Sequence, residues 1–102
     1  MAIDIYVTCK DRNEANVIAR HLLKLRLAAC VNIFPIESLY WWKEKIVDDN
    51  EIAMLIKAQE KNYNKISREI KKIHSYTVPC IIATKINKID RNYQRWIKEV
   101  SK

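Results

Sequence analysis

The sequence of residues 37–58 predicts one long β-hairpin, and this hairpin limits the folds that the chain can adopt. The aromatic run Tyr40-Trp41-Trp42 ends its first strand, and the charged tip Lys43-Glu44-Lys45 makes the turn. An apolar run from Ile52 to Ile56 lies in its second strand. Two adjacent tryptophans are a large apolar area for a chain whose core is small. We therefore expect a partner subunit or a ligand to cover them.

Length and composition indicate a small globular protein. We expect residues 1–102 to form one domain, and the apolar content of 49% argues against disorder. No apolar run approaches the roughly 20 residues that span a bilayer, and the N-terminus lacks the basic and apolar regions of a signal peptide. The expectation is a cytoplasmic protein without membrane contact.

The net charge of +7 admits nucleic acid or another anionic partner. However, the basic residues are scattered among glutamates and form no run longer than a pair, so a solvated surface is the favoured interpretation. The chain contains no glycine, which excludes phosphate-binding loops, dinucleotide fingerprints, EF-hands and nucleophile elbows. The RNA-recognition signature also needs a glycine. Nucleic-acid binding is therefore disfavoured.

Apolar periodicity predicts the order β-α-β-β-α-β followed by a third helix. The expected strands are residues 3–8, 28–42, 45–58 and 77–86, and the expected helices are residues 11–26, 61–73 and 90–100. Pro35 favours an edge position or a bulge for the second strand, because proline cannot donate to a central ladder. Right-handed split crossovers then give a ferredoxin-like antiparallel α+β sheet with the spatial order 4-1-3-2.

Cys9, His74 and Cys80 are expected at one edge of that sheet, the edge from which the hairpin projects. Two thiolates and an imidazole suit Cu(I) or Zn(II). Each residue also has a structural interpretation. A cysteine in a strand is usually a small buried apolar residue, and a histidine at a helix C-terminus interacts favourably with the helix dipole. The three cysteines form no CxxC pair, so we expect free thiols.

Other polar residues carry weaker signals. Cys30 lies in a run of small residues, where close packing is the favoured interpretation. Glu51 and Lys57 flank the apolar part of the third strand and are either solvated or paired across an interface. No Ser-His-Asp order, Cys-His-Asn order or apolar carboxylate pair stands out, so nothing specifies an enzyme.

Several blocks along nearly the whole chain resemble the CutA family, the divalent-cation tolerance proteins. The blocks are Ala29-Cys30-Val31-Asn32, Ser38-Leu39-Tyr40-Trp41-Trp42, Lys45-Ile46, Glu51, Lys57, His74-Ser75-Tyr76-Thr77-Val78-Pro79 and Tyr93-Gln94-Arg95-Trp96. The resemblance implies a ferredoxin-like subunit in a homotrimer, in which long hairpins extend the sheets across subunit boundaries. It also implies a cytoplasmic protein of divalent-metal tolerance, copper in particular, without established catalytic activity.

The resemblance leaves two functions open. In the first, His74 and Cys80, with Cys9, hold copper or another divalent metal near a cleft between subunits. In the second, the trimer is regulatory, by analogy with the nitrogen-regulatory signalling proteins, and its clefts bind a small effector or a partner protein. The residues expected at the cleft or the interface are Cys30, Asn32, Tyr40, Trp41, Trp42, Glu51 and Lys57.

The chain departs from the family pattern at three places. The family tip commonly reads Trp-Glu-Gly-Lys, whereas residues 42–45 here are Trp-Lys-Glu-Lys, so the turn needs positive φ without glycine or a looser loop. Many members carry Glu after the Val-Pro pair, where this chain has Cys80, a softer ligand. Ser75 replaces the proline that follows the histidine.

Overall fold

An antiparallel sheet of four strands organises the chain, and the computed structural model describes residues 1–102. The elements are β1 (Ala2–Cys9), α1 (Arg12–Lys24), β2 (Ala28–Trp42), β3 (Lys45–Gln59), a 3-10 turn η1 (Glu60–Asn62), α2 (Tyr63–Ile73), β4 (Ile81–Lys85) and α3 (Arg91–Val100). The strand order β2-β3-β1-β4 confirms the predicted ferredoxin-like arrangement. No helix is long and apolar enough to cross a membrane.

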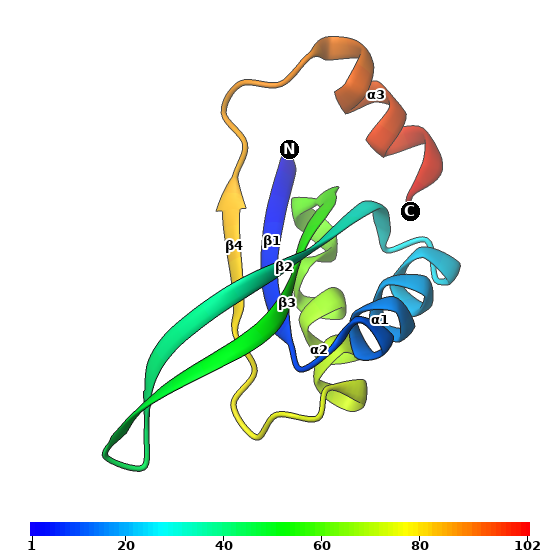
Figure 1. Cartoon of the computed structure of the whole chain (residues 1–102). Helices are drawn as coiled ribbons and strands as arrows, with labels where there is room; N and C mark the ends of the chain where they lie inside the picture. Colours follow the sequence, from blue (N-terminus) through cyan, green and yellow to red (C-terminus); the bar gives the residue numbers. More distant parts are fainter.

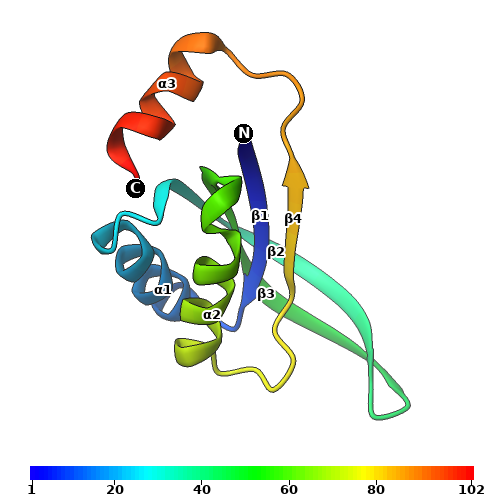
Figure 2. The ribbon, with the colours of Figure 1, turned by 180° about the vertical axis from the view of Figure 1, so that it is seen from behind.

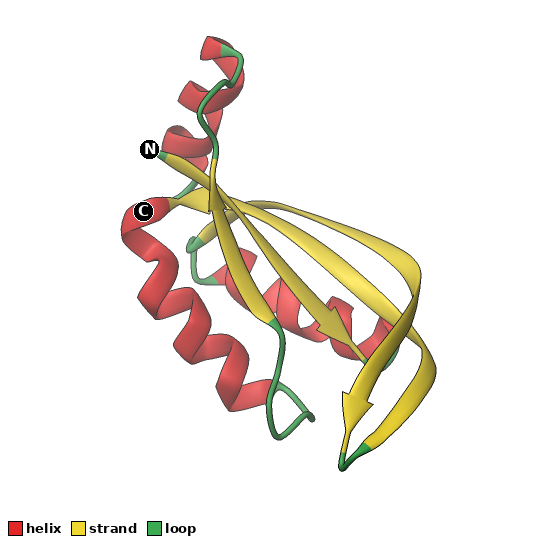
Figure 3. Ribbon diagram, turned by 90° about the vertical axis from the view of Figure 1, so that its left-hand side faces the viewer, coloured by secondary structure: helices red, strands yellow, loops and turns green.

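Helices α1 and α2 lie on one face of the sheet, whereas α3 lies beyond the end at which β1 begins (Figures 1, 2 and 3). Alternate residues of β1, from Ile3 to Cys9, point at α1 and α2 and are buried there. They pack with Ile18 of α1 and Ile66 of α2. Each such apolar side chain contributes roughly 1.5–3 kcal/mol on burial. The intervening residues of β1 face the side of the sheet that α1 and α2 leave open.

The hairpin of β2 and β3 extends far beyond the other two strands (Figure 1). The pairing of β1 with β3 ends at Cys9 and Ile52, while the pairing of β2 with β3 continues to Trp42 and Lys45. β2 is an edge strand, which explains how Pro35 is tolerated within it. Because no further strand or helix covers the projecting part, Trp41 is 71% exposed.

The tip of the hairpin is a tight turn built without glycine. Trp42 pairs with Lys45, so only Lys43 and Glu44 connect the strands. Their φ angles are 49° and 65°, the left-handed values that a two-residue turn of type I′ requires. Lys45 belongs to β3, which confirms the predicted start of that strand.

A third left-handed residue follows α1, which ends two residues earlier than predicted. Arg26 has φ 62°, and its N–H donates to Leu23 O at 3.0 Å while the N–H of Leu27 donates to Leu22 O at 3.1 Å. These two bonds form a Schellman motif, in which glycine is the usual residue at the position of Arg26.

β4 begins at Ile81, four residues later than predicted. It pairs with Ile3 to Val7 of β1. Pro79 has no N–H for a ladder, and residues 75–80 instead form a loop beside the hairpin. This loop forms one wall of the candidate site.

Candidate functional site

Cys9 and His74 meet as predicted, but their third neighbour is Glu14 and not Cys80. The potential ligand atoms of Cys9, Glu14 and His74 all lie within 4.8 Å of one another. Cys9 ends β1, Glu14 lies in the first turn of α1, and His74 caps the C-terminus of α2. The fold therefore places a thiol, a carboxylate and an imidazole where these three elements meet.

Glu14 is held in this group by the local structure of the α1 N-terminus. Its own N–H donates to the Asp11 side chain at 2.9 Å, and its carboxylate accepts from the Lys10 N–H at 3.1 Å and from the Ser75 N–H at 2.8 Å. Burial by itself would raise the pKa of Glu14, but these hydrogen bonds outweigh it and the pKa lies below its ordinary value. Glu14 is thus a nearly buried carboxylate anchored by backbone donors.

Both nitrogens of the His74 ring have partners. Nε2 lies 2.7 Å from Thr8 O, to which it donates, and Nδ1 accepts from the Tyr76 N–H at 3.1 Å. This pattern requires the tautomer with its proton on Nε2. His74 therefore links the end of α2 to β1 and to the loop that follows α2.

Cys9 is fully buried in the same group. Burial, followed by the nearby charges of Glu14, Asp11 and Glu51, raises the pKa of the Cys9 thiol to about 12. The thiol is therefore neutral at physiological pH, and a metal would have to displace its proton.

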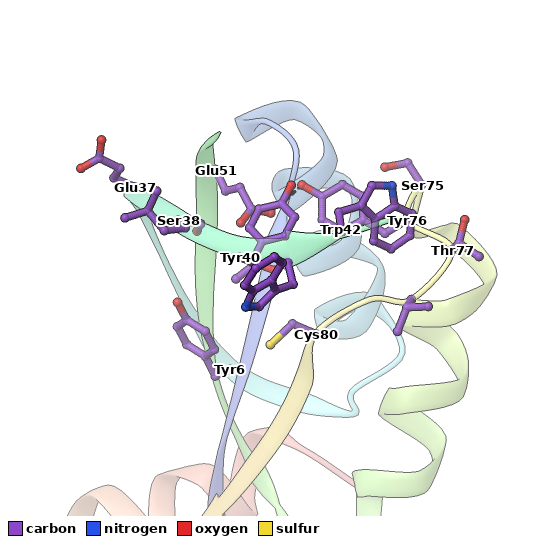
Figure 4. A pocket seen from close by; sticks show the side chains of 14 residues that line it. Tyr6, Glu37, Ser38, Tyr40, Trp42, Glu51, Ser75, Tyr76, Thr77 and Cys80 are labelled. Atoms are coloured by element: carbon purple, nitrogen blue, oxygen red, sulfur yellow. Dashed lines mark hydrogen bonds between the residues drawn. The ribbon is translucent and has the colours of Figure 1, made fainter. Parts of the chain in front are cut away.

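Cys80 lies on the opposite face of the sheet from Cys9, which corrects the predicted grouping of the three residues. Ile81 pairs with Val7, whose side chain points at the helices. Cys80 directly precedes β4, and its neighbours in a cavity place it on the other side of the sheet. It lines a cavity together with Tyr6 and Thr8, the residues of β1 that point away from the helices (Figure 4).

This cavity has a volume of about 830 Å³ and lies between the hairpin and the loop before β4 (Figure 4). We call it the hairpin cavity. It is lined by Tyr6, Thr8, Glu37, Ser38, Leu39, Tyr40, Trp41, Trp42, Glu51, Ser75, Tyr76, Thr77, Val78 and Cys80. Four of the residues expected at a cleft, Tyr40, Trp41, Trp42 and Glu51, thus meet in one place.

Glu51 is the most enclosed charged group of the hairpin cavity, at 7% exposure. The hydroxyl of Tyr76 donates to Glu51 Oε2 at 2.6 Å. Burial, this hydrogen bond and the charge of Glu51 raise the pKa of Tyr76. Burial and Glu51 likewise raise the pKa of Cys80. The site therefore combines the nearly buried carboxylate of Glu51 with neutral hydroxyl and thiol groups.

The remaining expected cleft residues lie elsewhere on the open face. Lys57 donates to Asn32 Oδ1, and Cys30 is the cross-strand partner of Lys57. None of the three lines the hairpin cavity. They belong to the opposite end of the sheet, near Tyr93 of α3, whose pKa is raised first by burial and then by Cys30.

Sequence reasoning missed Tyr6, Glu14 and Tyr76 as site residues. Glu14 follows Asp11 at the spacing of a capping box, a pattern that identifies a helix start and no chemistry. Tyr76 lies in the block shared with the CutA family, although nothing in that block shows that its hydroxyl reaches Glu51. Tyr6 follows from strand alternation once the open face is known.

Comparisons with known proteins show the family of this chain. The family model described as CutA1 divalent ion tolerance protein matches residues 3–100. The divalent-cation tolerance protein CutA of Archaeoglobus fulgidus is 44% identical over 95 residues, which cover 93% of both chains. That of Thermotoga maritima is 38% identical over 95 residues, covering 93% of this chain and 94% of the relative.

The chain also resembles solved structures of related proteins in its fold. The structure of the periplasmic divalent cation tolerance protein CutA of Archaeoglobus fulgidus superposes with a TM-score of 0.96 at 43% identity, covering 98% of each chain. The divalent cation tolerance protein of Thermus thermophilus superposes with the same TM-score at 36% identity over the full length of both chains. The matches in sequence and in fold cover nearly the whole chain, and the chain belongs to the CutA1 divalent ion tolerance protein family.

Proposed function

We propose that this protein is a cytoplasmic homotrimer that acts in tolerance of divalent metal ions, copper in particular, by binding a metal ion or a small effector near the clefts between subunits. The observation that carries the proposal is the family match over residues 3–100, together with relatives named for divalent-cation tolerance that cover 93% of this chain. The protein acts through binding and not through catalysis.

The projecting hairpin supports the trimer. Leu39, Trp41 and Ile46 are all at least 66% exposed, on an arm whose strands pair only with each other. Exposed apolar groups and unpaired strand edges both favour association with another chain. A cyclic arrangement in which each hairpin covers the next subunit would bury these groups three times over.

The free thiols support the cytoplasmic location. All three cysteines are unpaired, as expected for a protein kept in a reducing compartment. Fractionation of cells that express the untagged protein tests this part of the proposal. Recovery with periplasmic or secreted markers would contradict it.

The group of Cys9, Glu14 and His74 fits a soft or borderline metal ion by the types of its donor atoms. Sulfur, nitrogen and oxygen within 4.8 Å of one another suit copper or zinc. Binding would require Cys9 to lose its thiol proton and His74 to release one of its hydrogen bonds, so the affinity should rise with pH. The proposal assigns Cys80 to the hairpin cavity, because that thiol lies on the opposite face.

Titration of the reduced protein with Cu(I) against a coloured chelator tests direct binding. We expect Cys9→Ser to weaken the affinity by about tenfold or more, as loss of a ligand does. Cys30→Ser is the matched control, since Cys30 lies outside the group, and should bind like the wild type. Thermal unfolding of each metal-free variant verifies its fold. Unchanged affinity in both Cys9→Ser and His74→Ala would reject the site, and loss in Cys80→Ser alone would move it to the hairpin cavity.

A second function is favoured by the hairpin cavity itself. A regulatory trimer would bind a small ligand or a partner protein there, and its effect on metal tolerance would be indirect. The volume of about 830 Å³ is within the range of roughly 300–1,000 Å³ found for small-molecule sites. Full complementation of metal tolerance in cells by a variant lacking all three cysteines would favour this function. Loss of complementation in that variant would favour direct metal binding.

A further inference from the structure

The hairpin cavity differs in charge from the rest of the protein. The chain carries 19 Lys+Arg against 12 Asp+Glu. The cavity lining nevertheless contains no lysine, arginine or histidine, and its only ionisable carboxyl groups are those of Glu37 and Glu51. An acidic recess in a basic protein disfavours anionic ligands and favours cations.

Glu51 has an oxygen available to a ligand. Tyr76 donates to Oε2 at 2.6 Å, whereas Oε1 accepts no hydrogen bond within the protein. A carboxylate has about four lone-pair sites, so one donor leaves most of its capacity unused. The residue is only 7% exposed and lines both the hairpin cavity and a smaller recess that contains Lys10 and Arg12, so a ligand in the hairpin cavity lies beside this carboxylate.

The neighbours of Glu51 inside the hairpin cavity carry no positive charge. Burial, followed by the hydrogen bond and charge of Glu51, raises the pKa of Tyr76. Burial also raises the pKa of Cys80, and burial with the nearby Cys80 and Glu51 raises that of Tyr6. All three groups therefore stay protonated and neutral at physiological pH. None of them supplies a positive charge to pair with the Glu51 carboxylate inside the cavity.

Aromatic rings form much of the remaining wall. Tyr6, Tyr40, Trp41, Trp42 and Tyr76 all line the cavity, and Figure 4 shows rings of β1, β2 and the loop around the same space. The faces of tyrosine and tryptophan attract cations and also accommodate apolar groups. Rings around one enclosed carboxylate are suited to an ammonium group that carries an apolar body.

A metal ion fits this cavity less well than an organic cation does. The only group of three His, Cys, Asp or Glu side chains close enough to share an ion is Cys9, Glu14 and His74, on the other face of the sheet. A metal bound in the cavity would lack the three or four ligands that stable protein sites supply. The volume of about 830 Å³ also far exceeds the size of an ion.

From this geometry we propose that the hairpin cavity binds a small organic ammonium ion, whose N–H donates to Glu51 Oε1 and whose apolar body lies against the rings of Tyr40, Trp42 and Tyr76. The inference rests on the proposed function, because it names the chemical class of the small effector. The projecting hairpin forms one wall, so the occupied cavity would also hold the hairpin against the loop before β4.

Calorimetric titration of the intact protein with three probes of one shape tests the proposal. The probes are 2-phenylethylammonium, neutral 2-phenylethanol and anionic 3-phenylpropionate. We expect the ammonium probe to bind about tenfold or more tightly than the alcohol, the scale of a partly buried charge pair with cation–π contacts, and the carboxylate not to bind. Tryptophan fluorescence should change on binding, because two of the three tryptophans line the cavity.

Glu51→Gln removes the charge and keeps the shape, and it should abolish the preference for the ammonium probe. Asp48→Asn is the matched control: it removes a carboxylate of the same hairpin that does not line the cavity, and it should bind like the wild type. If Glu51→Gln fails to fold, the three-probe series on the wild type remains decisive. Equal affinity for the ammonium and the alcohol probes overturns the proposal. The absence of any binding, which would result if another subunit filled the cavity, overturns it as well.

The same preparation separates this inference from the proposed function. A protein of trimeric mass that takes up Cu(I) through Cys9 but ignores the ammonium probe refutes only the inference. A monomeric protein without metal affinity refutes the proposed function, whatever the probe does.

Discussion

Tyr76 donates its hydroxyl hydrogen to Glu51 Oε2 at 2.6 Å and thereby joins the loop before β4 to the base of the hairpin. The two residues are 25 positions apart and belong to segments that share no ladder of backbone hydrogen bonds. The position of the projecting arm relative to the loop therefore depends on this side-chain contact.

Tyr76→Phe should destabilise the protein by about 1–3 kcal/mol, because it leaves a nearly buried carboxylate without its donor. Urea unfolding at neutral pH measures the change. Tyr40→Phe is the matched control, since the Tyr40 hydroxyl bonds to Asp49 at 3.2 Å in an exposed position, and it should cost about 0.5 kcal/mol or less. Equal costs for the two variants would show that the enclosure of Glu51 does not matter.

Glu14 should stabilise the fold by an amount that decreases at acid pH. Its pKa in the folded protein lies below the ordinary value, so its contribution is complete above about pH 4.5 and is lost as the pH falls through the folded pKa. Glu14→Gln should therefore lower the melting temperature at pH 7 and differ progressively less from the wild type below pH 4.5. Calorimetry across that range checks the convergence, and a constant difference would contradict the assigned hydrogen bonds.

Cys9 should make the stability of the fold decrease with rising pH in the alkaline range. Its pKa is raised from 9.0 to about 12, so the neutral thiol stabilises the fold fully below pH 9 and this contribution is lost as the pH rises toward 12. The wild type should therefore lose stability more steeply than Cys9→Ala between these pH values. Native alkylation at pH 8 gives an independent measure, in which Cys9 should stay unmodified until denaturant is added.

Glu44→Gly should stabilise the hairpin. Glu44 has φ 65°, where a side chain costs energy and glycine does not, and the expected gain is about 0.5–1 kcal/mol. Thermal unfolding of the intact protein measures it. Glu37→Gly is the contrasting variant, because Glu37 lies within β2, and it should destabilise.

Replacing Trp41 and Trp42 by Ser should dissociate the proposed trimer while the subunit retains its fold. Both side chains are substantially exposed in the subunit, so their loss leaves the buried core between the sheet and its helices intact. Analytical ultracentrifugation under reducing conditions gives the mass, and circular dichroism verifies the fold. Trp96→Ser, on α3, is the control and should remain trimeric. A trimeric double variant would show that the hairpin is not the assembling arm.

Much of the fold was predictable because periodicity is a local property of the sequence. The strand order followed from the order of elements and the handedness of crossovers, and Pro35 correctly indicated an edge strand. The start of β4 was not predictable, since Thr77 and Val78 are β-branched, like residues of a strand. Their departure from the sheet depends on Pro79 and on where the partner strand lies.

The candidate site was predictable only in part, because the side of the sheet on which a residue lies depends on the three-dimensional structure. The common edge of Cys9 and His74 followed from topology. The side of the sheet on which Cys80 lies required the register of β4 against β1. The contact between Tyr76 and Glu51 depends on the path of an irregular loop, which no periodicity describes.

The alternation of side chains along β1 determines how mutations in this strand affect the two sites. Thr8 lines the hairpin cavity and Cys9, the next residue, belongs to the group with Glu14 and His74. A point substitution at Thr8 or Cys9 therefore changes the side chain of one site directly, although backbone donors of Ser75 and Tyr76 still connect the two sites through Glu14 and His74. An insertion or deletion of one residue in β1 would exchange the faces and lose both sites together.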